Sequence, residues 1–126
     1  MRATVPPFFW PAGAGTEPEA PPPQGLIVLG HDEVRYVVVM PDGTVASVDP
    51  AMPLATQFVN SSTHHFTASL EALVARRAEL ARAEHDGALL AISSLRHDLN
   101  RIDISALGDR DHFWAVVLDH LEDEVP

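Results

Sequence analysis

The sequence predicts an α+β domain in which a small antiparallel sheet from the N-terminal half packs against about three C-terminal helices. Short segments rich in β-branched residues and separated by turn residues fill positions 26–59. Apolar residues at helical spacing fill most of the remaining sequence. Because the strands precede the helices and do not alternate with them, this fold is favoured over an α/β nucleotide-binding fold.

The chain begins with a Pro-rich segment, residues 1–25, which holds seven of the 11 prolines. Proline fixes φ and lacks an amide donor, so we expect this segment to be extended or irregular. Phe8, Phe9 and Trp10 make it more apolar than a plain linker, and we expect it to dock partly on the rest of the chain. Residues 26–126 have the size of a single domain.

Three segments have the apolar, β-branched composition of strands: "LIVLG" at 26–30, "VRYVVVM" at 34–40 and "TVASV" at 44–48. "HDE" and "PDG" separate them as turns. In "PDG", Pro41 presets φ for a turn and Gly43 tolerates positive φ. "QFV" at 57–59 is a candidate for a fourth strand.

Three amphipathic helices are predicted after the strands. The first has a buried stripe of Phe66, Leu70, Leu73, Val74 and Leu80. The second runs from about Ala88 to Arg101 and has apolar positions at Leu89, Ile92, Leu95 and Leu99. The third begins near Asp109 and buries Phe113, Trp114, Val117, Leu118 and Leu121.

The stretch "QFVNSSTHHF" at 57–66 contains residue types found in active sites. A Ser–His hydrolase is one interpretation, but the sequence lacks the G-x-S-x-G nucleophile elbow. Helix capping is favoured, because Asn, Ser and Thr side chains accept hydrogen bonds from the first free amides of a helix. We therefore expect residues 60–63 to cap the first helix, and Phe58 and Phe66 to face the core.

The histidines do not have the spacing of a metal site. His64 and His65 are adjacent on a predicted helix and point about 100° apart, whereas a helical zinc pair needs i,i+4 spacing. We expect the seven histidines to be surface residues and expect neither a metal nor a cofactor. The chain also lacks cysteine, which excludes thiolate metal sites and thiol nucleophiles.

The net charge of −10 argues against direct binding of DNA or RNA, because that affinity depends on Lys and Arg. It favours encounter with a basic protein, although solubility alone also accounts for it. No apolar run is long enough for a membrane span, and the N-terminus lacks a secretory signal. We therefore expect a cytoplasmic protein that does not associate with membranes.

Several motifs resemble the SUKH superfamily of bacterial toxin-immunity proteins, and within it the fourth subgroup. They are "GLIVLGHDEVRYVVVMPDGTVASVDP", "FVNSS" leading into a helix, and "DISALGDRDHFWAVVLDHLED". The residues that carry the resemblance, here called the signature residues, are Gly43, Val45, Phe58, Asn60, Ser61, Phe66, Asp103, Phe113 and Trp114.

This resemblance implies a protein without catalytic activity that binds and neutralises a toxin, often a nuclease or a deaminase. A regulatory adaptor that scaffolds a cellular protein is the alternative. Such relatives usually begin with a helix, whereas this chain begins with "MRATVPPFFWP". We expect one sheet face to lack part of its cover, which a homodimer would supply. The candidate partner-binding residues are Asp32, Glu33, Asp42, Asp49, His64, His65, Glu122, Asp123 and Glu124.

Overall fold

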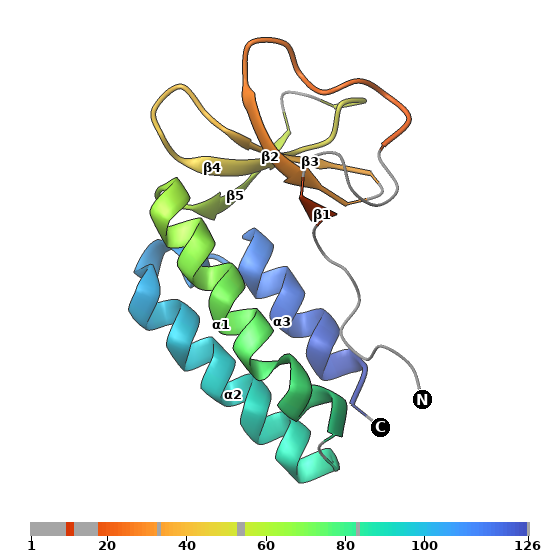
Figure 1. The fold of residues 1–126 in the computed structure, drawn as a ribbon, viewed down its shortest axis with the longest axis vertical. Helices are drawn as coiled ribbons and strands as arrows, with labels where there is room; N and C mark the ends of the chain where they lie inside the picture. Colours follow the sequence, from red (N-terminus) through yellow and green to blue (C-terminus); the bar gives the residue numbers. More distant parts are fainter. Residues whose placement is uncertain (1–9, 12–17, 33, 53–54, 83, 126) are drawn as a thin grey trace.

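The fold consists of an antiparallel sheet with three helices on one side of it (Figure 1). The computed structural model describes residues 10–11, 18–32, 34–52, 55–82 and 84–125. The strands are β1 (Trp10–Pro11), β2 (Ile27–His31), β3 (Tyr36–Val39), β4 (Val45–Val48) and β5 (Thr56–Asn60). The helices are α1 (Thr63–Arg82), α2 (His85–Ile102), the 3-10 helix η1 (Ile104–Leu107) and α3 (Phe113–Asp123). The predicted α+β class is confirmed.

The sheet is a meander in which the strands lie in sequence order and each is antiparallel to the next. The turn between β3 and β4 has the predicted chemistry. Gly43 has φ of 91°, and its amide donates to the Met40 carbonyl at 2.9 Å. Positive φ is a conformation that glycine adopts at little cost, so the "PDG" prediction is confirmed.

Part of the Pro-rich segment joins the sheet. Trp10 in β1 pairs with His31 of β2, and the Tyr36 hydroxyl donates to the Ala20 carbonyl at 2.7 Å. Phe8 and Phe9 lie outside the described residues. The contact with Tyr36 places Ala20 beside the smaller apolar cluster of the sheet.

The two faces of the sheet carry separate apolar clusters, because side chains alternate along a strand. Val37, Val45 and Val59 face the helices and belong to the main core. Tyr36, Val38 and Val48 form a smaller cluster on the opposite face. The helical residues buried in the main core are Phe66, Leu73, Ile92, Leu95, Leu99, Ala106, Phe113, Trp114, Val117, Leu118 and Leu121.

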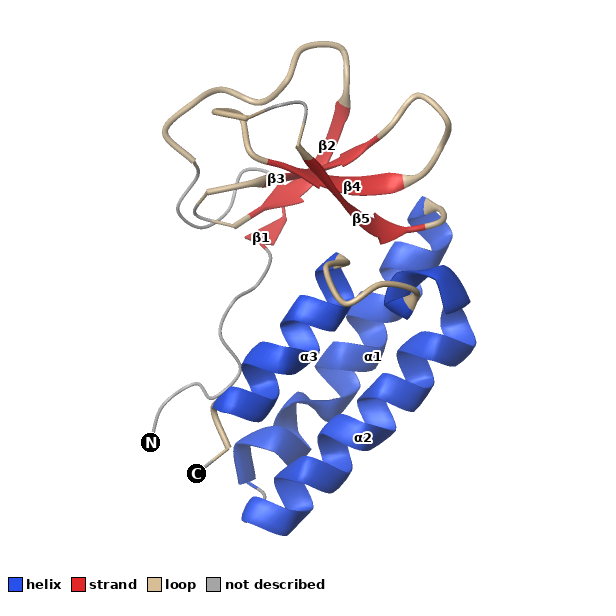
Figure 2. Cartoon of the chain, turned by 180° about the vertical axis from the view of Figure 1, so that it is seen from behind, coloured by secondary structure: helices blue, strands red, loops and turns tan. Residues whose placement is uncertain are grey.

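The helices lie side by side and meet the sheet at one end, as Figure 2 shows from behind. That end consists of the start of α1, the end of α2 and the start of α3 (Figure 1). Within the described residues, no helix has both the length and the apolar character needed to cross a membrane.

Helical periodicity overestimates the buried stripe at two positions. Val74 is 57% exposed and Leu89 is 38% exposed, although both follow the apolar pattern. Val74 is turned about 100° from the buried Leu73, which places it at the margin of the stripe. The third helix begins at Phe113, later than predicted, because residues 109–112 form a separate turn.

Candidate protein-binding groove

A buried polar network joins β5 to the helix ends that meet the sheet. Asn60 is fully buried, and its amide Nδ2 donates to Ser69 Oγ at 3.2 Å and to Asp103 Oδ2 at 3.0 Å. Trp114 Nε1 donates to Asn60 Oδ1 at 2.8 Å. The backbone amide of Ser61 donates to Asp103 Oδ2 at 2.7 Å, and its hydroxyl donates to Oδ1 at 2.8 Å. Asn60 and Ser61 therefore satisfy buried polar groups, and the prediction that they cap the helix is wrong.

Asp103 is the acceptor at the centre of this network and is 5% exposed. Burial acts to raise the pKa of its carboxyl group. The hydrogen bonds from the Ser61 amide, the Asn60 side chain, the Ser61 hydroxyl and the Ser105 amide outweigh burial and hold that pKa below its ordinary value. A buried, charged carboxylate thus fixes the end of α2 against β5.

Ser62 is the residue that caps α1. Its hydroxyl oxygen accepts a hydrogen bond from the His65 backbone amide at 3.2 Å and lies 2.7 Å from His65 Nδ1. The helix begins at Thr63, so this is the geometry of a capped first turn. Neither Ser62 nor His65 is among the described residues that line the groove defined below. The prediction of a cap is confirmed at this residue.

The histidines do not all lie on the surface. His31 is 1% exposed and packs edge to face against Tyr36, with ring centroids 6.3 Å apart. The prediction that every histidine is a surface residue is therefore wrong, because His31 belongs to β2 and not to the following turn. Among the described residues, no group of three or more His, Asp or Glu side chains is placed to hold a metal ion.

Three predicted partner-binding acids lie in the hairpin turns of the sheet. Each carboxylate accepts from its own turn: Asp32 from the Val34 and Arg35 amides, Asp42 from the Thr44 amide and hydroxyl, and Asp49 from the Ala51 amide. Asp32 and Asp49 follow residues that both pair with Tyr36, so they lie at the same end of the sheet. Asp42 lies at the opposite end.

The other predicted partner-binding residues are dispersed. Glu122, Asp123 and Glu124 are exposed at the end of α3 that points away from the sheet (Figure 1), and Glu122 lies 3.5 Å from the Arg96 guanidinium. His64 is exposed and His65 is half-buried on the first turn of α1. Glu33 lies outside the described residues. The structure therefore does not gather the predicted residues into one surface.

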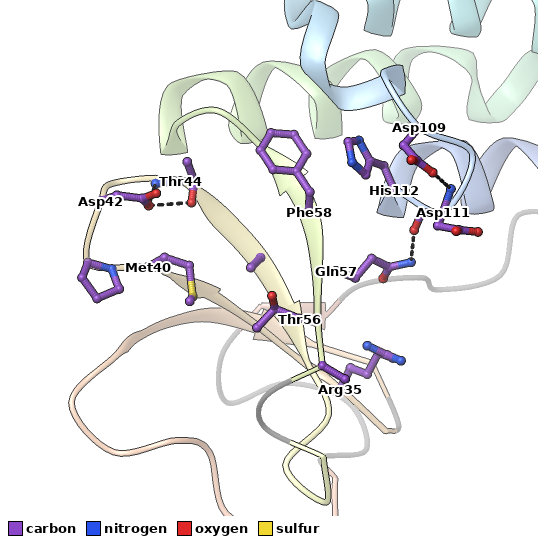
Figure 3. Close-up of a pocket in the computed structure, with 13 residues that line it drawn as sticks. Arg35, Met40, Asp42, Thr44, Thr56, Gln57, Phe58, Asp109, Asp111 and His112 are labelled. Carbon is purple, nitrogen blue, oxygen red and sulfur yellow. Dashed lines mark hydrogen bonds between the residues drawn. The ribbon is translucent and has the colours of Figure 1, made fainter.

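A groove of about 820 Å³ lies along β4 and β5, beside the turn before α3 (Figure 3). Its described lining comes from the turn between β3 and β4, from β4 and β5, from residues just before β3 and β5, and from the turn before α3. In Figure 3, Asp42 and Thr44 lie on one side, Asp109, Asp111 and His112 lie on the other, and Phe58 and Thr56 lie between them. Met40, Pro41, Ala46, Ala55, Gln57 and Arg35 complete the described lining.

Phe58 forms part of the groove and not of the core. It is half-buried, and its ring centroid lies 4.8 Å from that of His112. The prediction that both phenylalanines of "QFVNSSTHHF" face the core is therefore correct for Phe66, which is 3% exposed, and wrong for Phe58. A β-bulge between Val45 and Ala46 shifts the pairing with β5, and Phe58 pairs with Ala46, which also lines the groove.

Hydrogen bonds hold the acidic residues of the groove in place. Gln57 Nε2 donates to the Asp111 carbonyl at 3.0 Å, which fixes the turn before α3 against β5. Within that turn, Asp109 Oδ1 accepts from the Asp111 amide at 2.8 Å. On the other side of the groove, two hydrogen bonds from Thr44 lower the pKa of Asp42. The bond from the Thr44 hydroxyl has the larger effect, and the bond from the Thr44 amide has the smaller one. The Asp42 and Asp109 carboxylates are therefore each held in direction by a hydrogen bond within their own turn.

These features define a class of protein: a small α+β domain with an acid-rimmed groove on its sheet. The family model of the SUKH-4 immunity protein matches residues 2–120, and the chain therefore belongs to the SUKH-4 immunity protein family. No curated protein and no solved structure matches the chain. Membership of this family supports a role in immunity to a toxin.

Proposed function

We propose that the protein binds a cognate bacterial toxin and neutralises it by covering the site at which the toxin binds its substrate. The observation that carries this proposal is the match to the SUKH-4 immunity protein family over residues 2–120. The protein acts by binding alone and has no catalytic step.

The net charge of the chain supports a proposal that the toxin is basic and acts on nucleic acid, as a nuclease or a deaminase does. Such an enzyme needs Lys and Arg to hold phosphate groups. A protein of net charge −10 is attracted to the same basic surface and competes with the nucleic acid for it. The encounter takes place in the cytoplasm, where the nucleic acid is.

The test uses the cognate toxin domain from the producing organism, purified with an inactivating substitution. We expect a one-to-one complex by calorimetry, with an affinity that falls as the NaCl concentration rises, because salt screens the attraction between the two charged surfaces. The active toxin domain should lose activity in proportion to the immunity protein added. A toxin that is neither bound nor inhibited would refute the proposal. Recovery of a housekeeping protein in its place would favour the adaptor function.

A further inference from the structure

We propose that the groove is the toxin-contact site and that it holds a basic segment of the toxin, with an Arg or Lys side chain between the acidic rim and the apolar floor. This inference rests on the proposed function and specifies the surface through which it operates.

The charge of the rim matches a cationic occupant. Asp42, Asp109 and Asp111 are all exposed and lie on two opposite sides of the groove. In the part of the chain that the structure describes, none of the three forms an ion pair. Arg35 also lines the groove, and within the described residues it forms no ion pair with these three carboxylates, whereas Arg110 on the same turn is not among the described lining residues. The rim thus presents negative charge that the described residues leave without an ion-pair partner.

The floor suits the aliphatic part of a long basic side chain. Met40, Ala46 and Phe58 line it, and the Phe58 ring lies beside His112. Lys and Arg side chains place their methylene groups on apolar surface while the charged group stays near carboxylates. An aromatic ring adds a favourable contact with a guanidinium group. The floor and the rim together therefore select a cation carried on an apolar stem.

The groove is also prepared for binding before the toxin arrives. Asp109 accepts from the Asp111 amide, and the Asp111 carbonyl accepts from Gln57, so the turn is held against β5. On the opposite side of the groove, Asp42 accepts from the amide and hydroxyl of Thr44. Groups that are already ordered lose less conformational entropy on association.

The experiment compares two triple variants that change the net charge equally, from −10 to −7. The groove variant is Asp42→Asn, Asp109→Asn and Asp111→Asn. Asparagine keeps an oxygen that can accept the turn hydrogen bonds, so the turns are retained. The control variant is Glu122→Gln, Asp123→Asn and Glu124→Gln at the far end of α3. Both are titrated with the inactivated toxin domain described above, and urea denaturation checks that each is folded.

We expect the groove variant to bind at least about tenfold more weakly than wild type and the control variant to bind within about twofold, because close charge pairs in interfaces contribute strongly. Phe58→Ala, tested separately, should also weaken binding about tenfold. If wild type binds and both triple variants bind equally well, the groove is not the contact site, although the proposed function stands. Loss of binding in the control variant alone would assign the contact to the end of α3.

A second copy of the chain is the competing occupant. Sedimentation of the free protein distinguishes it from a toxin segment. A monomer at micromolar concentration agrees with the inference. A homodimer that the groove variant dissociates would overturn it, because the groove would then be occupied by the partner copy before the toxin binds.

Discussion

Asp103 offers the sharpest test of how the fold is held together. Its Oδ2 accepts from Asn60 Nδ2 and the Ser61 amide, and its Oδ1 accepts from the Ser61 hydroxyl and the Ser105 amide. Asp103→Asn keeps the size of the side chain but replaces one oxygen by an NH₂ group. If Oδ2 is replaced, the Asn60 and Ser61 amides lose their acceptor. If Oδ1 is replaced, the Ser105 amide loses its acceptor, whereas the Ser61 hydroxyl can turn to accept from the new NH₂ group.

Hydrogen bonds to a charged group contribute about 1.5–3 kcal/mol each, so losing at least one of them together with the charge should lower the free energy of unfolding of Asp103→Asn by about 2–4 kcal/mol. That is a large part of the ~5–15 kcal/mol typical of a domain. Urea denaturation at pH 7, followed by far-UV circular dichroism, should show a midpoint lower by roughly 1–3 M. The control is Asp119→Asn, which makes the same change of charge at an exposed position of α3 and should alter stability by less than about 0.5 kcal/mol.

The pH dependence gives an independent check. The pKa of Asp103 is lower in the folded state than its ordinary value. The corresponding stability is therefore present above the ordinary aspartate pKa of about 3.9 and is lost as the pH falls through the folded-state pKa. The difference between wild type and Asp103→Asn should shrink below about pH 4. Equal stability at pH 7, or a difference that grows on acidification, would show that the network does not stabilise the fold.

Three further predictions concern single elements. Trp114→Phe removes the donor to Asn60 Oδ1 and leaves that buried oxygen without this hydrogen bond. The free energy of unfolding, measured by urea denaturation, should fall by about 1–3 kcal/mol. Ser62→Ala removes the cap of α1 and should lower the free energy of unfolding by about 1 kcal/mol. The neighbouring substitution Thr63→Ala should leave it almost unchanged, and equal losses in the two variants would contradict the assignment of the cap. Gly43→Ala places a side chain at φ of 91° with no atom within 4 Å of the added Cβ, so strain alone should lower the melting temperature, by an amount equivalent to about 1–2 kcal/mol.

The sequence predicts the fold class because hydrophobic periodicity and turn chemistry are local properties. The strand at 57–59, the "PDG" turn and the first helix are all found close to where the pattern places them. Side-chain roles in "FVNSS" could not be predicted in the same way. Asn60 and Ser61 have the residue types of helix caps, and the acceptor that engages them, Asp103, is more than 40 residues away in the chain.

The groove, too, could not be predicted from a local sequence pattern. It depends on the bulge that places Phe58 beside Ala46 and on a turn at 109–112 that the apolar periodicity assigns to a helix. Asp109 forms its own turn by accepting from the Asp111 amide, which delays the helix. Of the predicted partner-binding residues, Asp42 lines the groove, whereas the acids at the end of α3 lie on another part of the molecule.

The separation between the buried network and the groove rim has a consequence for how such a protein can change its target. Asn60, Asp103 and Trp114 are inaccessible and hold the sheet to the helices, whereas Asp42, Asp109 and Asp111 are exposed at the edge of the groove. Substitutions at exposed surface positions usually alter stability little. Substitutions at the rim residues can therefore adapt the groove to a different toxin while the buried network keeps the fold unchanged.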